Sequence, residues 1–262
     1  MRPRFPIRDS PLVEIGQASF ARLVAIQFVD RAIALGSLAF TALVPLLLIA
    51  AAYIPGADGL ASELIDRFHL TGPTAAAVDQ LFAQPDDVQQ AISWIGVLVL
   101  VGASLSFTRG LQRIYEAAWR LPSRGWRGSR AGLEWIGGIV LWTTVFASAR
   151  TWLIDRTGPV GTLVVLLGGN ALLWVWSPYV LLARRLPWRT LVPSGLVTSL
   201  AMTAYSIGSV VYMPGAIDQS ASRYGSIGIA IALVSWLVGL GFALTASAGI
   251  GAVLGERYPR PA

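Results

Sequence analysis

The sequence predicts an all-α integral membrane protein: a bundle of six transmembrane helices with an N-terminal amphipathic helix and short helices on its outer surface. Two observations carry this prediction. Of the 262 residues, 55% are hydrophobic and only 13% are charged, whereas ordinary globular chains carry roughly 25% charged residues. Long apolar runs also alternate with polar connections, and each run is long enough to cross the roughly 30 Å hydrocarbon core as a helix.

Residues 1–31 form the N-terminal segment, which we expect in the cytoplasm and at the membrane surface. Ser10 followed by Pro11 is typical of a helix start, because a proline at the first helical position loses no hydrogen bond. Phe20, Val24 and Phe28 recur every four residues and therefore share one face. This pattern predicts an amphipathic interfacial helix, and it fits a packing helix of a cytoplasmic layer equally well.

Six apolar segments follow, and each is predicted to be a transmembrane helix. They cover residues 32–54, 92–108, 133–154, 160–183, 191–213 and 225–254. The turn between the third and fourth segments, Asp155 to Gly158, is short, so these two segments should be antiparallel neighbours. Residues 255–262 form a tail.

The distribution of arginine predicts the orientation, since all 20 basic residues are arginines. With both termini in the cytoplasm, 16 of them fall on the cytoplasmic side, where an excess of basic residues is expected. The connection 55–90 is acidic, which is typical of the outer side, and its short amphipathic patterns predict surface helices. No cleavable signal peptide is evident in the first 20 residues. The expected location is the plasma membrane.

Arginine is densest directly after the second segment, where residues 109–130 hold six arginines and one acid, Glu116. We expect this stretch to be a cytoplasmic loop. Arg109 and Arg113 are four residues apart and are candidates for holding an anionic lipid headgroup, because guanidinium groups bind phosphate and carboxylate in a bidentate manner. The alternative is that they only anchor the helix end.

Arg150 is a further candidate for an anionic headgroup, since it lies about four residues from the outer end of the third segment. Charged residues inside membrane segments are costly and tend to mark functional sites. Arg150 either faces the bundle interior, or extends to the interface and pairs with Asp155.

Three other features of the segments are expected to be structural. Glu134 should pair with Arg109 if the second and third segments pack together. Asn170, near the middle of the fourth segment, should hydrogen-bond another helix or line a wet cavity. Gly251 and Gly255 form a small-residue pair that would permit a close helix crossing.

The composition argues against most catalytic and metal chemistry. The chain has no cysteine and a single histidine, His69, so thiol nucleophiles and the usual zinc ligand sets are not available. We expect no metal, no cofactor and no nucleic-acid partner, because the arginines lie between apolar runs rather than on a polar fold. An intramembrane enzyme is a minor alternative, with Glu134 and nearby serines as its only acid and nucleophiles.

Four stretches resemble one family when taken in order. They are LAFTALVPLLL (38–48), SLSFTRGLQRIYEAAW (104–119), LPWRTLVPSGLV (186–197) and RYGSIGIAIALVSWLVGLGFALTASAGIGAVLGE (223–256). Together they are similar to the YihY / virulence factor BrkB family of bacterial inner-membrane proteins. The resemblance implies a six-helix protein linked to envelope integrity, with a part in transporting lipids or other amphiphiles. An older description of such proteins as a ribonuclease finds no support in these residues.

The residues and the resemblance together lead to one functional expectation and one rival. The expectation is a protein that holds or moves an anionic lipid or other amphiphile, using arginines at both ends of a polar-lined cleft and no covalent chemistry. The rival is a structural membrane protein that docks envelope machinery without a substrate path.

Overall fold

The computed structural model describes residues 11–53, 72, 76 and 94–257, and the regular structure in this part of the chain is helical. The elements in chain order are α1 (Pro11–Ala25), α2 (Phe28–Tyr53), α6 (Trp94–Ala118), a short 3-10 helix η1 (Gly125–Gly128), α7 (Ser129–Leu181) and α8 (Trp188–Glu256). The predicted all-α class is confirmed for these residues. His69 and most of the connection 55–90, with its predicted surface helices, lie outside them.

Three helices among the described residues are long and apolar enough to cross a membrane, namely Val160–Leu181, Trp188–Gly225 and Ile227–Glu256. A fourth candidate is a bent pair made of Pro11–Ala25 and Phe28–Leu43, whose axes differ by 62°. The predicted number of six transmembrane helices therefore stays a prediction.

Helices α7 and α8 are each a pair of arms that meet at a glycine. Gly158 has φ 66° and Gly225 has φ 61°, a backbone conformation that glycine adopts far more readily than other residues. In α7 this break falls in the predicted turn. In α8, the predicted loop between residues 213 and 225 is wrong, because the first arm stays helical up to Gly225. Met213 and Ile217, one turn apart, bury against the second arm and give this stretch a packed face.

Helix α6 is longer than predicted. It ends at Ala118 and not near residue 108, so the arginines expected in a loop begin inside a helix. Leu111, Ile114, Tyr115 and Ala118 follow helical spacing and are fully buried. This face was not recognised in the sequence, because the arginines between its members suggested a polar loop.

The predicted N-terminal amphipathic helix is divided into two elements. α1 ends at Ala25, and α2 begins at Phe28 after Gln27, which has φ 54°. Phe20 and Val24 are exposed, whereas Phe28 packs edge-on against Phe242 of α8 at a centroid distance of 5.2 Å. The three residues therefore do not share one environment, because the break rotates α2 relative to α1.

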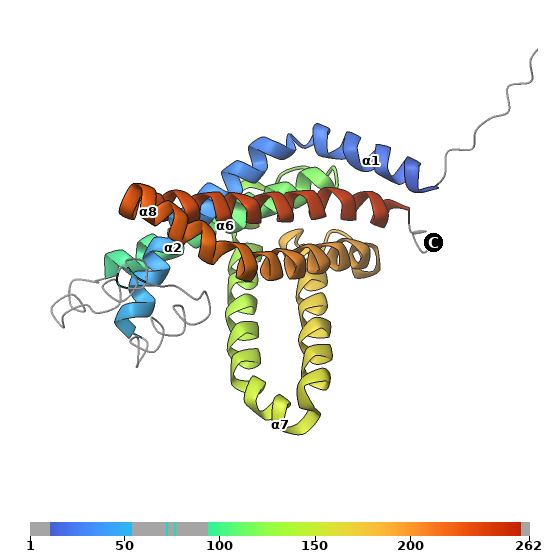
Figure 1. Ribbon diagram of the computed structural model, residues 1–262. Helices are drawn as coiled ribbons and strands as arrows, with labels where there is room; N and C mark the ends of the chain where they lie inside the picture. Colours follow the sequence, from blue (N-terminus) through green and yellow to red (C-terminus); the bar gives the residue numbers. More distant parts are fainter. Residues whose placement is uncertain (1–10, 54–71, 73–75, 77–93, 258–262) are drawn as a thin grey trace, which may run out of the picture.

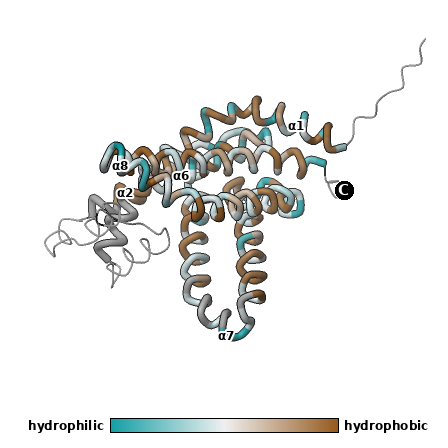
Figure 2. The backbone as a smooth tube through the Cα atoms, in the orientation of Figure 1, coloured by the Kyte–Doolittle hydropathy of each residue, from teal (hydrophilic) through white to brown (hydrophobic). Residues whose placement is uncertain are grey.

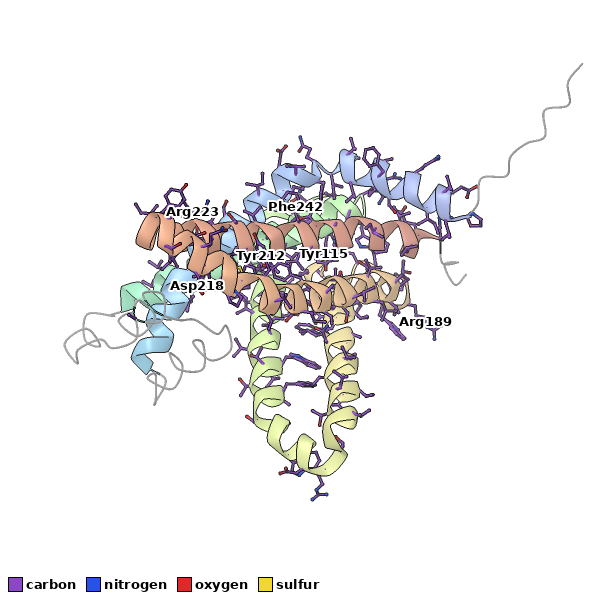
Figure 3. The ribbon with its side chains drawn as sticks, in the orientation of Figure 1. Tyr115, Arg189, Tyr212, Asp218, Arg223 and Phe242 are labelled. Atoms are coloured by element: carbon purple, nitrogen blue, oxygen red, sulfur yellow. The ribbon has the colours of Figure 1, made fainter. Side chains whose placement is uncertain are left out.

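The two arms of α7 project together from the other helices (Figure 1). Both arms carry hydrophobic residues along much of their length (Figure 2), and many of these side chains are exposed. The main core lies where α2, α6 and α8 meet the base of α7, and Tyr115 is buried in it (Figure 3).

Close helix crossings depend on glycine at several positions. A Cβ atom on Gly36 of α2 would lie 2.5 Å from the Cα of Val238 in α8. Gly251 and Gly255 allow the two arms of α8 to approach, since a Cβ on Gly251 would lie 2.4 Å from the Cα of Ser194. The predicted close crossing at Gly251 and Gly255 is confirmed.

We expect Gly36→Ala to destabilise the protein by about 1–3 kcal/mol, because the added methyl group meets backbone that cannot move aside. The measurement is the temperature at which half of the purified protein remains monodisperse in detergent. The matched control is Gly102→Ala in α6, where no atom lies within 4 Å of the added Cβ. Because alanine favours helix more than glycine does, the control should be neutral or slightly stabilising. Equal loss in both variants would contradict the close crossing.

Candidate functional site

Arg109 and Arg113 line the same small cavity, of about 90 Å³, between α6 and the loop that follows it. We call it the Arg109 cavity. Its other lining residues are Gln112, Glu116, Ser123 and Gly125. The sequence predicted these two arginines as a pair, and the structure brings them together.

The helical period explains how the cavity is assembled. Residues 109, 112, 113 and 116 have the spacing of one helix face. The opposite face of the same turns carries the buried core residues Leu111, Ile114 and Tyr115. Since these apolar side chains fix the rotation of α6, the polar face must point at the loop. The cavity therefore follows from core packing rather than from attraction between its polar groups.

Arg109, Arg113 and Gln112 differ in their hydrogen-bond partners. The Arg109 guanidinium donates to Ser129 Oγ at 3.2 Å. Arg113 is exposed, and its backbone carbonyl accepts a hydrogen bond from the Arg31 side chain. Gln112 is only 4% exposed, and its Nε2 has no hydrogen-bond partner among the described residues. A buried amide without a partner is costly, and Gln112 is among the residues that line the cavity.

The loop after α6 can pack against Gln112 only because residue 128 is a glycine. A Cβ atom on Gly128 would lie 2.5 Å from Gln112 Nε2. The 3-10 helix η1, which ends at Gly128, therefore lies directly against the amide.

Glu116 is neutralised from the far side of the loop. The Glu116 residue is only 3% exposed, and its carboxylate pairs with Arg185 at 2.6 Å. Arg185 also donates to the carbonyl of Pro122 at 2.8 Å, and the backbone N–H of Arg124 donates to Glu116 at 3.2 Å. Because Arg185 pairs with Glu116, the charge of the one acid that lines the cavity is balanced within the structure.

A second ion pair, whose arginine is buried and whose acid is 35% exposed, lies at the same end of the molecule. Arg22 of α1 binds Glu256 of α8 through two bonds, of 3.1 and 2.7 Å. Arg22 also donates to the carbonyl of Ala118, the last residue of α6. Neither this pair nor the pair of Glu116 with Arg185 was predicted. The available signal for the latter was Glu116 itself, a single acid among six arginines.

The other predicted residues lie elsewhere. Glu134 pairs with Arg184 at 3.0 Å and not with Arg109, so the predicted partner was wrong. Because α6 continues past residue 108, Arg109 contacts Ser129 instead. Asn170 donates to Ser199 Oγ at 3.0 Å and also to Thr203, so it links α7 to α8. Arg150 belongs to α7, but its side chain lies outside the described residues.

The crevice between the two arms of α7 is apolar. It has a volume of about 460 Å³ and is lined by side chains such as Trp142, Phe146 and Trp176. The expected polar-lined cleft therefore does not run between these arms. Within the described ranges, no cluster of three or more potential metal ligands occurs.

Comparison with known proteins identifies one family. A family model described as Virulence factor BrkB matches residues 19–261. No curated protein and no solved structure matched the chain. The matched region includes the Arg109 cavity and the ion pairs of Glu116 with Arg185 and of Arg22 with Glu256.

We expect Arg185→Ala to lower the free energy of unfolding by about 3 kcal/mol, because it leaves the Glu116 carboxylate buried without its cation. The matched control is Arg184→Ala, which removes an ion pair with Glu134 whose two side chains are about half exposed. That change should cost less than about 1 kcal/mol. The measurement is thermal unfolding in detergent.

The double variant Glu116→Gln/Arg185→Gln should recover part of the lost stability, since no uncompensated charge then remains. Equal destabilisation by Arg185→Ala and Arg184→Ala would argue against a structural role for the buried pair.

Proposed function

Because the chain belongs to the virulence factor BrkB family, we propose that it is a multi-pass protein of the bacterial inner membrane that holds or moves an anionic lipid or similar amphiphile. Family membership and the apolar helices indicate a membrane protein. The proposed topology has six transmembrane helices and both termini in the cytoplasm. It is supported by the 16 arginines that this orientation assigns to the cytoplasmic side.

The observation that carries the proposal is the Arg109 cavity. It combines two arginines with a buried amide donor that has no partner among the described residues. A guanidinium group has five N–H donors, so Arg109 can bind a ligand while it holds Ser129. Hydrogen bonds from a charged donor to phosphate or carboxylate are among the strong ones in proteins. The chemistry of this donor set therefore fits an anion.

The size of the cavity limits what enters it. A volume of about 90 Å³ suits a single headgroup and excludes a whole lipid. The acyl chains would therefore lie outside, along the apolar surface of the helices. In this proposal the protein performs no covalent chemistry, and the family is not a known enzyme family. Its link to envelope integrity would follow from the lipid that it holds.

The proposal predicts that Arg109→Gln/Arg113→Gln weakens binding of a short-chain phosphatidylglycerol at least tenfold, since each lost charge-assisted bond is worth about 1.5–3 kcal/mol. Binding to the purified full chain is measured by calorimetric titration, with short-chain phosphatidylcholine for comparison. The control is Arg120→Gln/Arg130→Gln, which removes two exposed arginines near the same loop that do not line the cavity. Unchanged affinity in the first variant, or equal loss in the control, would refute the site.

A structural role is the second candidate function, and one observation favours it. The two ion pairs tie α1 to α8, and α6 to the connection between α7 and α8, at one end of the molecule, as a rigid support for other envelope proteins would require. Reconstituted vesicles separate the two functions. A carrier should accelerate transfer of fluorescent phosphatidylglycerol between leaflets, and the Arg109→Gln/Arg113→Gln variant should not. A scaffold should have no effect in either form.

A further inference from the structure

An open groove of about 930 Å³ lies apart from the Arg109 cavity, between the beginning of α1 and the two ends of α8. We call it the Trp188 groove. Its apolar lining includes Ile15 of α1, Val192 and Leu196 of the first arm of α8, and Leu254 of the second arm. Figure 1 shows the beginning of α1 and both ends of α8 on the same side of the molecule. The groove therefore joins elements that are far apart in the sequence.

Two arginines add positive charge to this apolar groove. Arg189 lies over the Trp188 ring at 5.8 Å, and it forms no ion pair with any carboxylate of the described residues. Arg257 has one nearby acid, Glu14, at 3.9 Å. The Arg257 and Glu14 side chains are both well exposed, so solvent screens the attraction between them. The groove thus presents two cations against one weakly held carboxylate.

The groove also lies where two candidate spans leave the membrane. Trp188 begins the span Trp188–Gly225, and Arg257 follows the last residue of the span Ile227–Glu256. Trp188 is exposed, and exposed tryptophans are enriched at the level of the lipid headgroups. Leu196 is also exposed, eight residues further along the helix, which is roughly 12 Å. Apolar and cationic groups are therefore separated along the direction in which a lipid is oriented.

We propose that the Trp188 groove binds an anionic phospholipid of the adjacent leaflet. Its phosphate lies between Arg189 and Arg257, and one acyl chain runs along Val192 and Leu196. Because Ile15 contributes to the lining, the bound lipid connects α1 to α8. This site shares no residue with the Arg109 cavity and does not depend on transport.

The absence of cysteine from the chain allows a direct test. A Leu196→Cys variant of the full chain carries a fluorescent label and is placed in lipid nanodiscs of phosphatidylcholine and phosphatidylglycerol. Bromine quenches the label on contact. It is carried by the acyl chains of phosphatidylglycerol in one preparation and by an equal amount of phosphatidylcholine in the other, so that bilayer charge is constant. A label at Leu163→Cys, which is exposed on α7 and does not line the groove, reports ordinary lipid contact.

We expect brominated phosphatidylglycerol to quench the label at position 196 at least about fivefold more effectively than brominated phosphatidylcholine. The preference should disappear in Arg189→Gln/Arg257→Gln and should be absent at position 163. The charge-matched control is Arg156→Gln/Arg223→Gln. Arg223 lies beside the bend of α8, at the far end of the first arm from Arg189 (Figure 3), so the control should retain the preference.

Three outcomes would overturn the proposal. Equal quenching by the two lipids would mean that the groove does not select charge. A preference that survives Arg189→Gln/Arg257→Gln but is lost in Arg109→Gln/Arg113→Gln would assign the lipid to the Arg109 cavity. Quenching at position 163 without any at position 196 would mean that protein fills the groove. If the titration finds no lipid bound at the Arg109 cavity while the label at position 196 shows the expected preference, the proposed function is refuted and the Trp188 groove stands as a site.

Discussion

The Glu116 carboxylate is shielded from solvent almost completely, and a buried carboxylate is tolerated as a charge only when a cation and hydrogen-bond donors surround it. Arg185 and the backbone N–H of Arg124 meet that requirement. One donor comes from the loop after α6, and the other from the connection between α7 and α8. The pair therefore ties the end of α6 to the connection between α7 and α8, while core packing turns Arg109 and Arg113 toward the cavity.

The same end of the molecule is closed from the other side by α1. Arg22 reaches both Glu256 and the carbonyl of Ala118, so the first and last described helices meet at the last turn of α6. Apolar burial of Leu111, Ile114 and Tyr115 orients α6, and the ion pairs then select which neighbours it contacts. Such pairs add little net stability when compared with apolar packing. Their effect is to make other arrangements of the same helices costly.

The two proposed binding sites use positive charge in different ways. The Arg109 cavity is small and rich in donors, so it distinguishes an anion from a neutral group. The Trp188 groove is wide and mostly apolar, so it distinguishes a lipid from a soluble anion. Both need only non-covalent recognition, which agrees with a chain that has no cysteine and one histidine.

The sequence alone predicted the all-α class and the membrane character, and it placed Arg109 and Arg113 four residues apart on one helix face, because composition and helical spacing act locally. It also predicted the contact of Gly251 and Gly255, since small residues at that spacing permit close approach on any helix. It could not determine the partners of Glu134, Glu116 and Arg22, which lie 50, 69 and 234 residues away in the chain. Those pairings arose only in the tertiary structure, because charge in a sequence specifies the need for a partner and only folding brings one within reach.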